Sequence, residues 1–224
     1  MPLTLAVVIP CYKPHLPKLL RLVASLSVQT RPPDEIVIAC SSVEPHEIPA
    51  LPALPATVSV RWVLTRGRAN TAQNRNIGSS VSRSDVISYI DADDIAHPRR
   101  CEAVLAAIEE GADIVLHNYA TDLAGHVWSD TVSAPTYNCL RKEPSGCVVH
   151  TGDWRTLLHH SQVTVRRKVW EVEGYPEGAE FERREDAVFC GRVVGRAGIR
   201  TAYLATPLSV YDAAGAWVDC DEKN

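Results

Sequence analysis

The sequence predicts a single α/β domain in which a mixed, mainly parallel β-sheet is covered by helices on both faces. Apolar segments alternate four times with segments of helical periodicity, as expected when each strand connects to the next through a helix. The strand segments are apolar along nearly their whole length, which is typical of strands buried on both faces. Polar and charged residues gather where these strands end, which indicates a ligand site at one edge of the sheet.

The first half of the chain contains most of the predicted sheet. We expect strands over residues 3–9, 35–40, 58–64, 86–90 and 113–117, and helices over residues 14–29, 71–81 and 99–110. Pro32 ends the first helix, since proline cannot continue it. Pro98 and Gly111 bracket the third, because proline is favoured at the first helical position and glycine just past the last.

Beyond residue 120 the pattern is less regular. We expect short strands and loops over residues 128–147, a short helix over 153–158, a strand over 162–166, a short helix over 168–172 and a longer one over 187–197. Glu185 and Asp186 open the last helix, where carboxylates suit the positive end of the helix dipole. Two strands, over residues 200–205 and 207–211, close the domain.

Composition excludes several classes of protein. The 224 residues are 46% hydrophobic and 22% charged, an ordinary globular balance. A net charge of −4 argues against a nucleic-acid partner. No apolar run approaches the roughly 20 residues of a membrane span, and the N-terminus lacks the charged region of a signal peptide. The seven cysteines include no C-x-x-C pair, which favours free thiols and a cytoplasmic location.

Three carboxylates, Asp91, Asp93 and Asp94, follow the strand over residues 86–90. Alternate side chains of an extended chain share a face, so we expect Asp91 and Asp93 to point together and Asp94 to point away. A hard divalent cation such as Mg²⁺ or Mn²⁺ would relieve their repulsion. The alternative is a solvated acidic turn ahead of the next helix, but the flanking strand and helix favour a metal site.

In sheets of this kind, ligands bind at the carboxyl ends of the strands. Residues 10–12, residues 40–42, Arg66 and residues 91–94 follow the first four predicted strands. We therefore expect these segments to converge on one site.

Seven short motifs are spread along nearly the whole chain. They are V-V-I-P-C-Y at 7–12, S-V-Q-T at 27–30, P-D-E-I-V-I at 33–38, N-R-N-I-G at 74–78, Y-I-D-A-D-D at 89–94, V-R-R-K-V-W-E-V-E-G-Y at 165–175 and R-R-E-D at 183–186. In this order and spacing the sequence resembles the family 2 glycosyltransferases. The resemblance implies the Rossmann-like GT-A fold, with residues 1–117 as the nucleotide-sugar-binding half and residues 118–224 as the acceptor-binding and catalytic half. The chain is short for that family, so it can also be one domain of a longer multidomain protein.

The resemblance implies roles for the donor-binding residues. Asp93 matches the metal ligand of the D-x-D motif, and Asp91 reaches the donor ribose or the water shell of the metal. Pro10 and Tyr12 resemble the residues that flank the nucleoside. Basic groups near the diphosphate correspond to Arg75 and Arg66, although Arg75 alone can equally pair with a surface acid.

On the acceptor side, Asp186 resembles the general base and Glu185 lies beside it in the acceptor cleft; taken alone, the pair would be an ordinary helix start. An Asp of ordinary pKa is ionised at neutral pH and can accept the proton of a hydroxyl. His159 and His160 can line the acceptor site or reach the metal, or they can be structural.

Two departures from the family pattern bear on binding. Ala39-Cys40-Ser41-Ser42 replaces an acidic run that helps to read the base, so base recognition at Cys40 differs from the family's. Otherwise Cys40 and Cys11 are small residues at the edge of the core. Tyr211-Asp212 stands where many members carry a histidine, which makes Asp212 a candidate substitute metal ligand.

The implied function is a metal-dependent, inverting glycosyltransferase that uses Mn²⁺ or Mg²⁺. It would move a sugar from a nucleotide-diphosphate donor to a hydroxyl of a glycan or other acceptor. One alternative is a sugar-phosphate nucleotidyltransferase, but residues 10–14 lack the glycine-rich phosphate loop. The other is a non-catalytic nucleotide-sugar or carbohydrate-binding module of a larger synthase, which the presence of both Asp93 and Asp186 disfavours.

Overall fold

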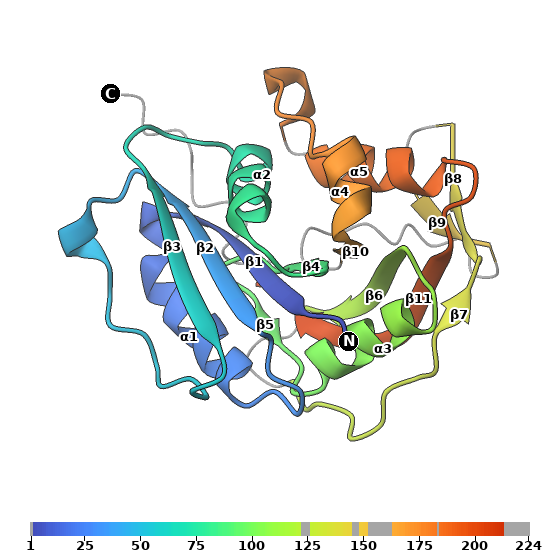
Figure 1. Ribbon diagram of the computed structural model, residues 1–224, viewed down its shortest axis with the longest axis horizontal. Coiled ribbons are helices and arrows are strands. Elements are labelled where there is room, and N and C mark those ends of the chain that lie inside the picture. Colours follow the sequence, from blue (N-terminus) through green and yellow to red (C-terminus); the bar gives the residue numbers. More distant parts are fainter. Residues whose placement is uncertain (1, 122–125, 145–147, 152–162, 183, 213–224) are drawn as a thin grey trace.

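A computed structural model describes residues 2–121, 126–144, 148–151, 163–182 and 184–212 (Figure 1). Its centre is a nine-stranded sheet of order β3-β2-β1-β4-β10-β6-β11-β5, in which β7 also pairs with β11. Six strands run in one direction: β3 (Ser59–Thr65), β2 (Glu35–Ser41), β1 (Leu5–Tyr12), β4 (Val86–Tyr89), β6 (Ile114–Ala120) and β11 (Thr201–Val210). The mainly parallel sheet predicted from the sequence is therefore confirmed.

The remaining strands run the other way. β10 (Val163–Arg166) lies between β4 and β6 and is antiparallel to both. β5 (Ile95–Ala96) and β7 (Thr136–Tyr137) pair antiparallel with β11. A separate pair is formed by β8 (Leu140–Lys142) and β9 (Val148–His150). Because β10 completes the centre of the sheet, both halves of the chain build one sheet.

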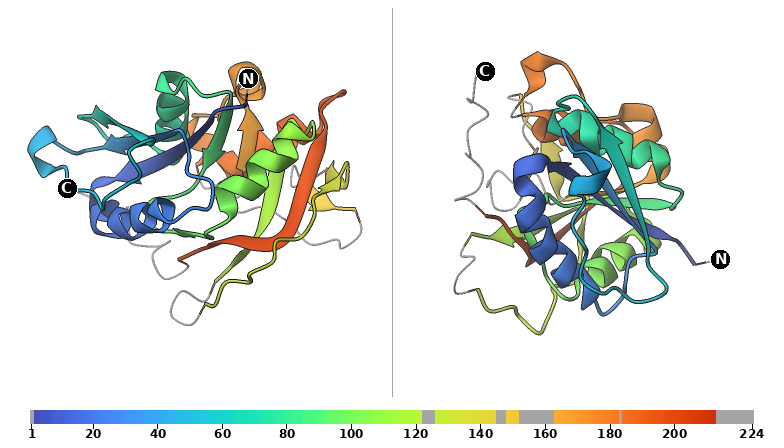
Figure 2. Two further views of the ribbon diagram at one scale, coloured as in Figure 1. Left: turned by 60° about the horizontal axis from the view of Figure 1, so that its bottom comes forward. Right: turned by 90° about the vertical axis from the view of Figure 1, so that its left-hand side faces the viewer.

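Helices cover both faces of this sheet, as predicted (Figure 1, Figure 2). The apolar faces of α1 (Leu16–Ser27) and α3 (Arg100–Glu109) pack in one core cluster, and those of α2 (Thr71–Val81), α4 (Arg167–Glu173) and α5 (Glu185–Val194) pack in the other. Three short 3-10 helices cover residues Lys13–His15, Pro45–Glu47 and Ala179–Phe181. None of the helices in the described ranges has the length and apolar character needed to cross a membrane.

Two residues determine where α2 begins and how closely it packs on the sheet: Asn70 at its start and Gly78 in its middle. Asn70 caps the helix, because its side chain accepts the N–H of Gln73 while the Gln73 side chain accepts the N–H of Asn70, both at 2.9 Å. A Cβ on Gly78 would lie only 2.6 Å from Cγ1 of Val8, so glycine lets α2 lie directly on β1. The helix predicted over residues 71–81 is confirmed.

Two predicted strand boundaries are wrong. β1 does not stop at Ile9 but continues to Tyr12 in register with β2. The carbonyl of Val8 accepts the N–H of Ile90, on the side of β1 that faces β4. The nitrogen of Pro10, two residues later, faces the same side but lies beyond the end of β4, so the N–H that proline lacks has no strand to pair with. The two closing strands are one strand, β11, whose register shifts around Pro207 because proline cannot donate to the ladder.

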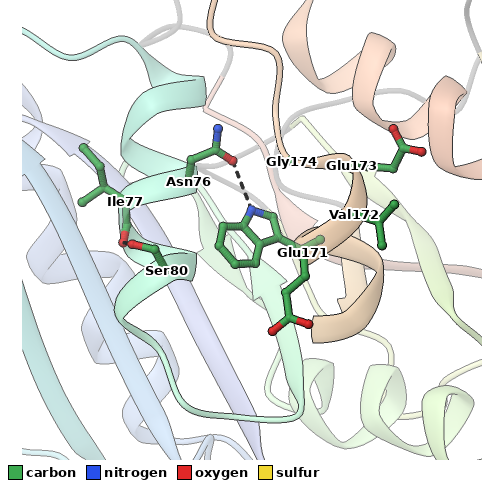
Figure 3. A pocket seen from close by; sticks show the side chains of 8 residues that line it. Asn76, Ile77, Ser80, Glu171, Val172, Glu173 and Gly174 are labelled. Atoms are coloured by element: carbon green, nitrogen blue, oxygen red, sulfur yellow. Dashed lines mark hydrogen bonds between the residues drawn. The ribbon is translucent and has the colours of Figure 1, made fainter.

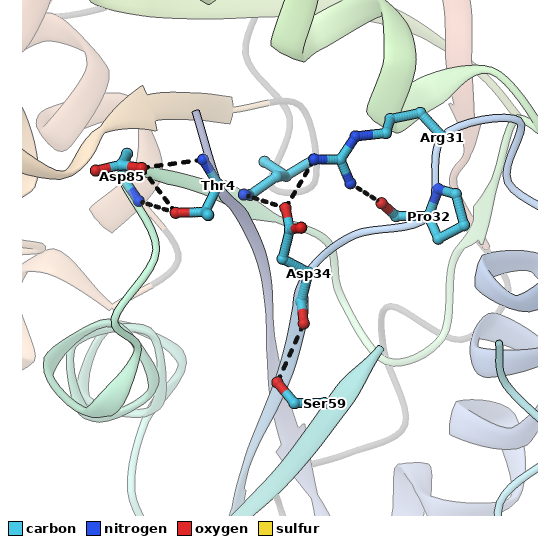
Figure 4. A network of polar contacts seen from close by, with 7 residues as sticks. Thr4, Arg31, Pro32, Asp34, Ser59 and Asp85 are labelled. Carbon is cyan, nitrogen blue, oxygen red and sulfur yellow. Dashed lines mark hydrogen bonds and ion pairs between the residues drawn. The ribbon is translucent and has the colours of Figure 1, made fainter. Parts of the chain in front are cut away.

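Side-chain hydrogen bonds connect the amino ends of β1, β2 and β4, at the edge of the sheet opposite the predicted site (Figure 4). Asp34 accepts the N–H of Leu5 and pairs with Arg31, both at 2.8 Å. Asp85 accepts the N–H and the hydroxyl of Thr4 at 3.0 and 2.7 Å, and these bonds lower its pKa. Side-chain bonds hold β1, β2 and β4 together at this edge, while their carboxyl ends carry the candidate site.

Candidate active site

Asp91, Asp93 and Asp94 lie in a tight turn at the carboxyl end of β4. The N–H of Asp94 donates to the carbonyl of Asp91 at 3.1 Å, so residues 91–94 form a turn and not the extended segment that we expected. Asp94 is fully buried, and its Oδ1 accepts the backbone N–H of Asp212 at 3.3 Å. The Asp94 carboxylate thus binds the backbone at Asp212, and Asp91 and Asp93 are the carboxylates of the turn that are available for a ligand.

The charges of Asp91 and Asp93 interact. Burial, followed by the charge of Asp91, raises the pKa of Asp93, whose exposed fraction is 7%. A divalent cation would relieve this repulsion, and carboxylate oxygens are the ligands that Mg²⁺ and Mn²⁺ prefer. Within the described ranges, no three His, Cys, Asp or Glu side chains form a complete cage for a metal. The pair fits a cation whose other ligands come from substrate phosphates and water.

Arg75 joins this turn to α5. Its side chain has no exposed surface and lies 2.9 Å from Oδ1 of Asp91 and 3.1 Å from Oε1 of Glu185. Burial alone would lower the pKa of Arg75, but the nearby groups Asp91, Tyr175, Glu185 and Asp186 raise it, so the guanidinium stays charged. Its predicted place near the donor diphosphate remains a prediction; in the structure it contacts carboxylates.

Sequence reasoning missed Asn76 and Tyr175. Asn76 holds the backbone of Tyr175, and the Tyr175 ring packs against the guanidinium of Arg75. Asn76 accepts the Tyr175 N–H at 2.9 Å and donates to the Tyr175 carbonyl at 2.8 Å. The Tyr175 ring lies 5.1 Å from the Arg75 guanidinium and stacks on Phe189 of α5 at 4.2 Å. An asparagine beside the arginine in the N-R-N motif was the only signal for this contact.

Glu185 and Asp186 form the first turn of α5 and are both 5% exposed. Asp186 Oδ1 accepts the N–H of Ala187 at 2.7 Å, and Glu185 is held by Arg75. Carboxylates at the amino end of a helix are stabilised by its dipole. The structure therefore connects the predicted base region to the turn after β4.

The residues predicted to bind the nucleoside differ in accessibility. Tyr12 is half-buried and its ring lies 6.5 Å from that of His15, while Pro10 is buried in β1. Cys40 has no exposed surface and lies in register with Cys11, within the core under α1. Contact with Cys40 and burial raise the pKa of the Cys11 thiol. These two thiols are core residues in the structure.

Two further residues were predicted to take part in the site, the basic Arg66 and the acidic Asp212. Arg66 is exposed in the loop after β3. Asp212, a candidate metal ligand, instead pairs with Arg21 at 3.1 Å and Lys18 at 3.4 Å. Burial raises its pKa, but these two cations outweigh burial and lower it. His159, His160 and the helix predicted over residues 153–158 lie outside the described residues.

A groove with a volume of about 560 Å³ lies between α2 and α4, away from these carboxylates (Figure 3). The Trp170 indole N–H donates to Asn76 Oδ1 at 3.1 Å in this groove. Its lining residues are Asn76, Ile77, Ser80, Trp170, Glu171, Val172, Glu173 and Gly174. It contains none of the predicted site residues.

The fold is similar to solved structures of TarS from S. aureus. The chain matches TarS 1-349 in complex with UDP with a TM-score of 0.65 and 15% identity, over 93% of this chain and 60% of that chain. It matches TarS 1-349 in complex with UDP-GlcNAc with a TM-score of 0.66 and 14% identity, over 93% and 58%. At this identity the likeness shows the fold, and the predicted GT-A fold is confirmed.

Two relatives are similar in sequence, and both have the word glycosyltransferase in their names. EpsH of Bacillus subtilis is 29% identical over 144 residues, which cover 61% of this chain and 40% of EpsH. A Haemophilus influenzae protein is 33% identical over 114 residues, which cover 49% of this chain and 36% of that protein. The alignments thus span less than half the length of either relative.

The family model described as glycosyl transferase family 2 matches residues 6–138, more than half of the chain. The match includes Arg75, Asp91 and Asp93, and it ends before Glu185 and Asp186. Together with the GT-A fold, it establishes that the chain belongs to glycosyl transferase family 2.

Proposed function

We propose that this chain is a metal-dependent, inverting glycosyltransferase that moves a sugar from a nucleotide-diphosphate donor to a hydroxyl acceptor. One observation carries the proposal: buried Arg75 links Asp91, at the carboxyl end of β4, to Glu185, which adjoins Asp186. The carboxylates proposed to hold the donor and the carboxylate proposed to activate the acceptor are therefore parts of one connected site.

Asp93 and Asp91 are the residues that would hold Mn²⁺ or Mg²⁺. When bound, the cation supplies positive charge that stabilises the leaving diphosphate. Asp91 is held in place by Arg75, so its carboxylate keeps a fixed position while the donor binds. Tyr12 lies half-buried at the end of β1, where its ring can pack against the nucleoside, and Pro10 shapes the same edge.

Asp186 is proposed to take the proton of the acceptor hydroxyl. A base of this kind raises the nucleophilicity of the hydroxyl oxygen as it attacks the anomeric carbon. One base facing one leaving group suits a single in-line displacement, which inverts the anomeric configuration. Glu185 holds the start of α5 through Arg75 and thereby sets the position of Asp186.

UDP-sugars are the first donors to test, because the similar TarS structures are complexes with UDP and UDP-GlcNAc. This chain carries buried Cys40 at the second strand, so a uracil would have to be recognised by other groups, such as backbone amides. The acceptor is proposed only as a hydroxyl of a glycan or similar molecule.

The decisive experiment combines binding and turnover. Thermal shifts with a panel of nucleotide sugars, each with and without Mn²⁺, identify the donor; a ligand at about 100 times its Kd stabilises by ~2.7 kcal/mol. Incubation of that donor with candidate acceptors, followed by NMR of the product anomer, tests transfer and inversion. Donor hydrolysis or transfer that is lost in Asp186→Asn supports an enzyme, whereas binding without any turnover supports the alternative of a nucleotide-sugar-binding module. Formation of a nucleotide sugar from a nucleoside triphosphate and a sugar 1-phosphate, with release of pyrophosphate, would instead indicate a nucleotidyltransferase.

A further inference from the structure

We infer that Arg21 and Asp212 are positioning residues that clasp the turn carrying Asp93, and that Asp212 acts through Arg21 and is not a metal ligand. The inference rests on the proposed function, in which Asp93 holds the cation. It assigns a role to a residue of α1 and to the second residue after β11, both outside the seven motifs quoted above.

The clasp is a closed ring of hydrogen bonds. Nη2 of Arg21 donates to the backbone carbonyl of Asp93 at 2.7 Å and to Oδ2 of Asp212 at 3.1 Å. A planar guanidinium nitrogen carries two hydrogens, so one nitrogen can make both bonds. The backbone N–H of Asp212 then donates to Oδ1 of Asp94, the next residue of the same turn, at 3.3 Å.

Three distant segments meet in this ring. Arg21 lies 72 residues before Asp93, and Asp212 lies 118 residues after Asp94. Within the turn, the Asp94 N–H donates to the Asp91 carbonyl. Fixing the carbonyl of Asp93 and the carboxylate of Asp94 from outside restricts the turn, and with it the direction of the Asp93 side chain.

The charges in the ring favour this role over metal ligation for Asp212. Its carboxylate is only 11% exposed and lies between Arg21 and Lys18, at 3.1 and 3.4 Å. A carboxylate balanced by two cations has little net charge left for a divalent ion. Outer residues that orient a metal ligand typically change metal affinity by about 10–100-fold when they are removed.

The two interpretations predict opposite effects for Arg21→Met. If Asp212 were a metal ligand, removing a competing cation would free its carboxylate and strengthen binding of Mn²⁺. If Arg21 and Asp212 form a clasp, the same variant loosens the turn and weakens binding. Lys18→Met is the matched control: Lys18 lies one turn earlier on α1 and pairs with the same carboxylate, but among the residues that the structure describes it makes no bond to the turn.

The first measurement is the Mn²⁺ concentration that gives half of the thermal shift at a fixed, saturating concentration of UDP. We expect Arg21→Met and Asp212→Ala each to raise this concentration by about tenfold or more, and the double variant to do no worse than either. Lys18→Met should stay within about twofold of the wild type, because its loss removes the same charge but leaves the clasp. Tighter Mn²⁺ binding by Arg21→Met would overturn the inference.

The second measurement needs no metal. Amide hydrogen exchange of a peptide covering residues 90–97, in the metal-free protein, should speed up in Arg21→Met and Asp212→Ala and not in Lys18→Met. Unchanged exchange in the first two variants overturns the clasp, whatever Mn²⁺ does. If the wild type shows no Mn²⁺-dependent shift with UDP, GDP, ADP or TDP while exchange changes as expected, the metal dependence of the proposed function is wrong and the clasp stands.

Discussion

Arg75 and Glu185 lie 110 residues apart in the sequence, yet their side chains meet at 3.1 Å with 0% and 6% of their surfaces exposed. A second bond, from Arg75 to Asp91, makes this guanidinium the link between the end of β4 and the start of α5. The positive charge of Arg75, shared by the buried Glu185 and the partly exposed Asp91, should affect stability and catalysis in ways that can be measured separately.

Removal of the guanidinium should be costly. Arg75→Met leaves Glu185 buried without its cation, and breaking a buried pair in this way typically costs about 3–5 kcal/mol. Urea unfolding gives the free energy directly. Arg68→Met is the control, because the Arg68–Glu182 pair is half exposed on both sides and its loss should change little. An Arg75→Met protein as stable as the wild type would show that the buried pair does not contribute to the free energy of unfolding.

Glu185 and Asp186 are adjacent, but their variants should differ. Asp186→Asn cannot accept a proton, so we expect kcat to fall by about 10²–10⁴ while the Kd for the donor is unchanged. Glu185→Gln keeps a hydrogen-bond acceptor for Arg75 but loses its charge, so it should lower the free energy of unfolding and reduce kcat less. Measurement of kcat, donor Kd and urea unfolding for both variants separates the two roles. Equal loss of kcat in both would contradict the assignment of Asp186 as the only base.

Base recognition should not depend on Cys40. Its thiol is fully buried beside Cys11, so Cys40→Ser should reduce stability without changing the order of affinities for UDP, GDP, ADP and TDP in Mn²⁺. Tyr12→Ala removes the half-exposed ring and should weaken all four, since stacking on a base is worth about 1–3 kcal/mol. Calorimetric titration measures both. A Cys40→Ser variant that reorders the four nucleotides would place the thiol in the binding site.

Stability should fall on acidification through His117. Burial, followed by the charge of Arg100, lowers the pKa of His117 to about 3 from its ordinary 6.5. Below pH 6.5 the unfolded chain binds a proton there and the folded protein does not. The stability this histidine contributes is therefore complete above pH 6.5 and is lost as the pH falls toward 3, by up to about 1.4 kcal/mol per pH unit.

The comparison is with His117→Gln, whose longer amide side chain can place its oxygen where His117 Nε2 accepts the Arg100 Nε–H at 3.3 Å. Urea unfolding at pH 7.5, 6.0 and 5.0 should show a shallower loss of stability in the variant. Parallel pH profiles for the two proteins would mean that His117 is protonated in the folded state at an ordinary pKa.

Local patterns predicted much of this fold because burial and chain punctuation act over a few residues. The apolar strands, the helix over residues 71–81 and the end of the short helix at Gly174 follow from periodicity, capping and glycine. Gly174 has φ of +55°, a conformation that glycine adopts without strain. The carboxyl-end convergence of residues 10–12 and 91–94 also follows from parallel pairing alone.

Long-range contacts could not be predicted in the same way. The burial of Arg75 depends on Glu185 arriving from 110 residues away, and a charged residue in a polar helix gives no sign of it. Residues 91–94 form a turn in place of the expected extended segment, and the bonds that this turn receives come from Arg21 and Asp212, which are distant in the sequence. The sequence predicts two strands, over residues 200–205 and 207–211, whereas pairing with β6 joins them into the single strand β11.

The place of β10 between β4 and β6 has a consequence for how the chain is made. During synthesis, residues up to Ala120 emerge long before Val163–Arg166, so the neighbouring edges of β4 and β6 stay open until the second half is translated. Ser88 and Thr164, whose hydroxyls meet at 2.6 Å, are separated by 76 residues, and pairings this distant form slowly. A fragment ending at residue 120 would leave one edge of β4 and both edges of β6 unpaired, because β11 is missing as well, and it should associate with other copies. Completion of the sheet therefore waits for residues 163–166 to leave the ribosome.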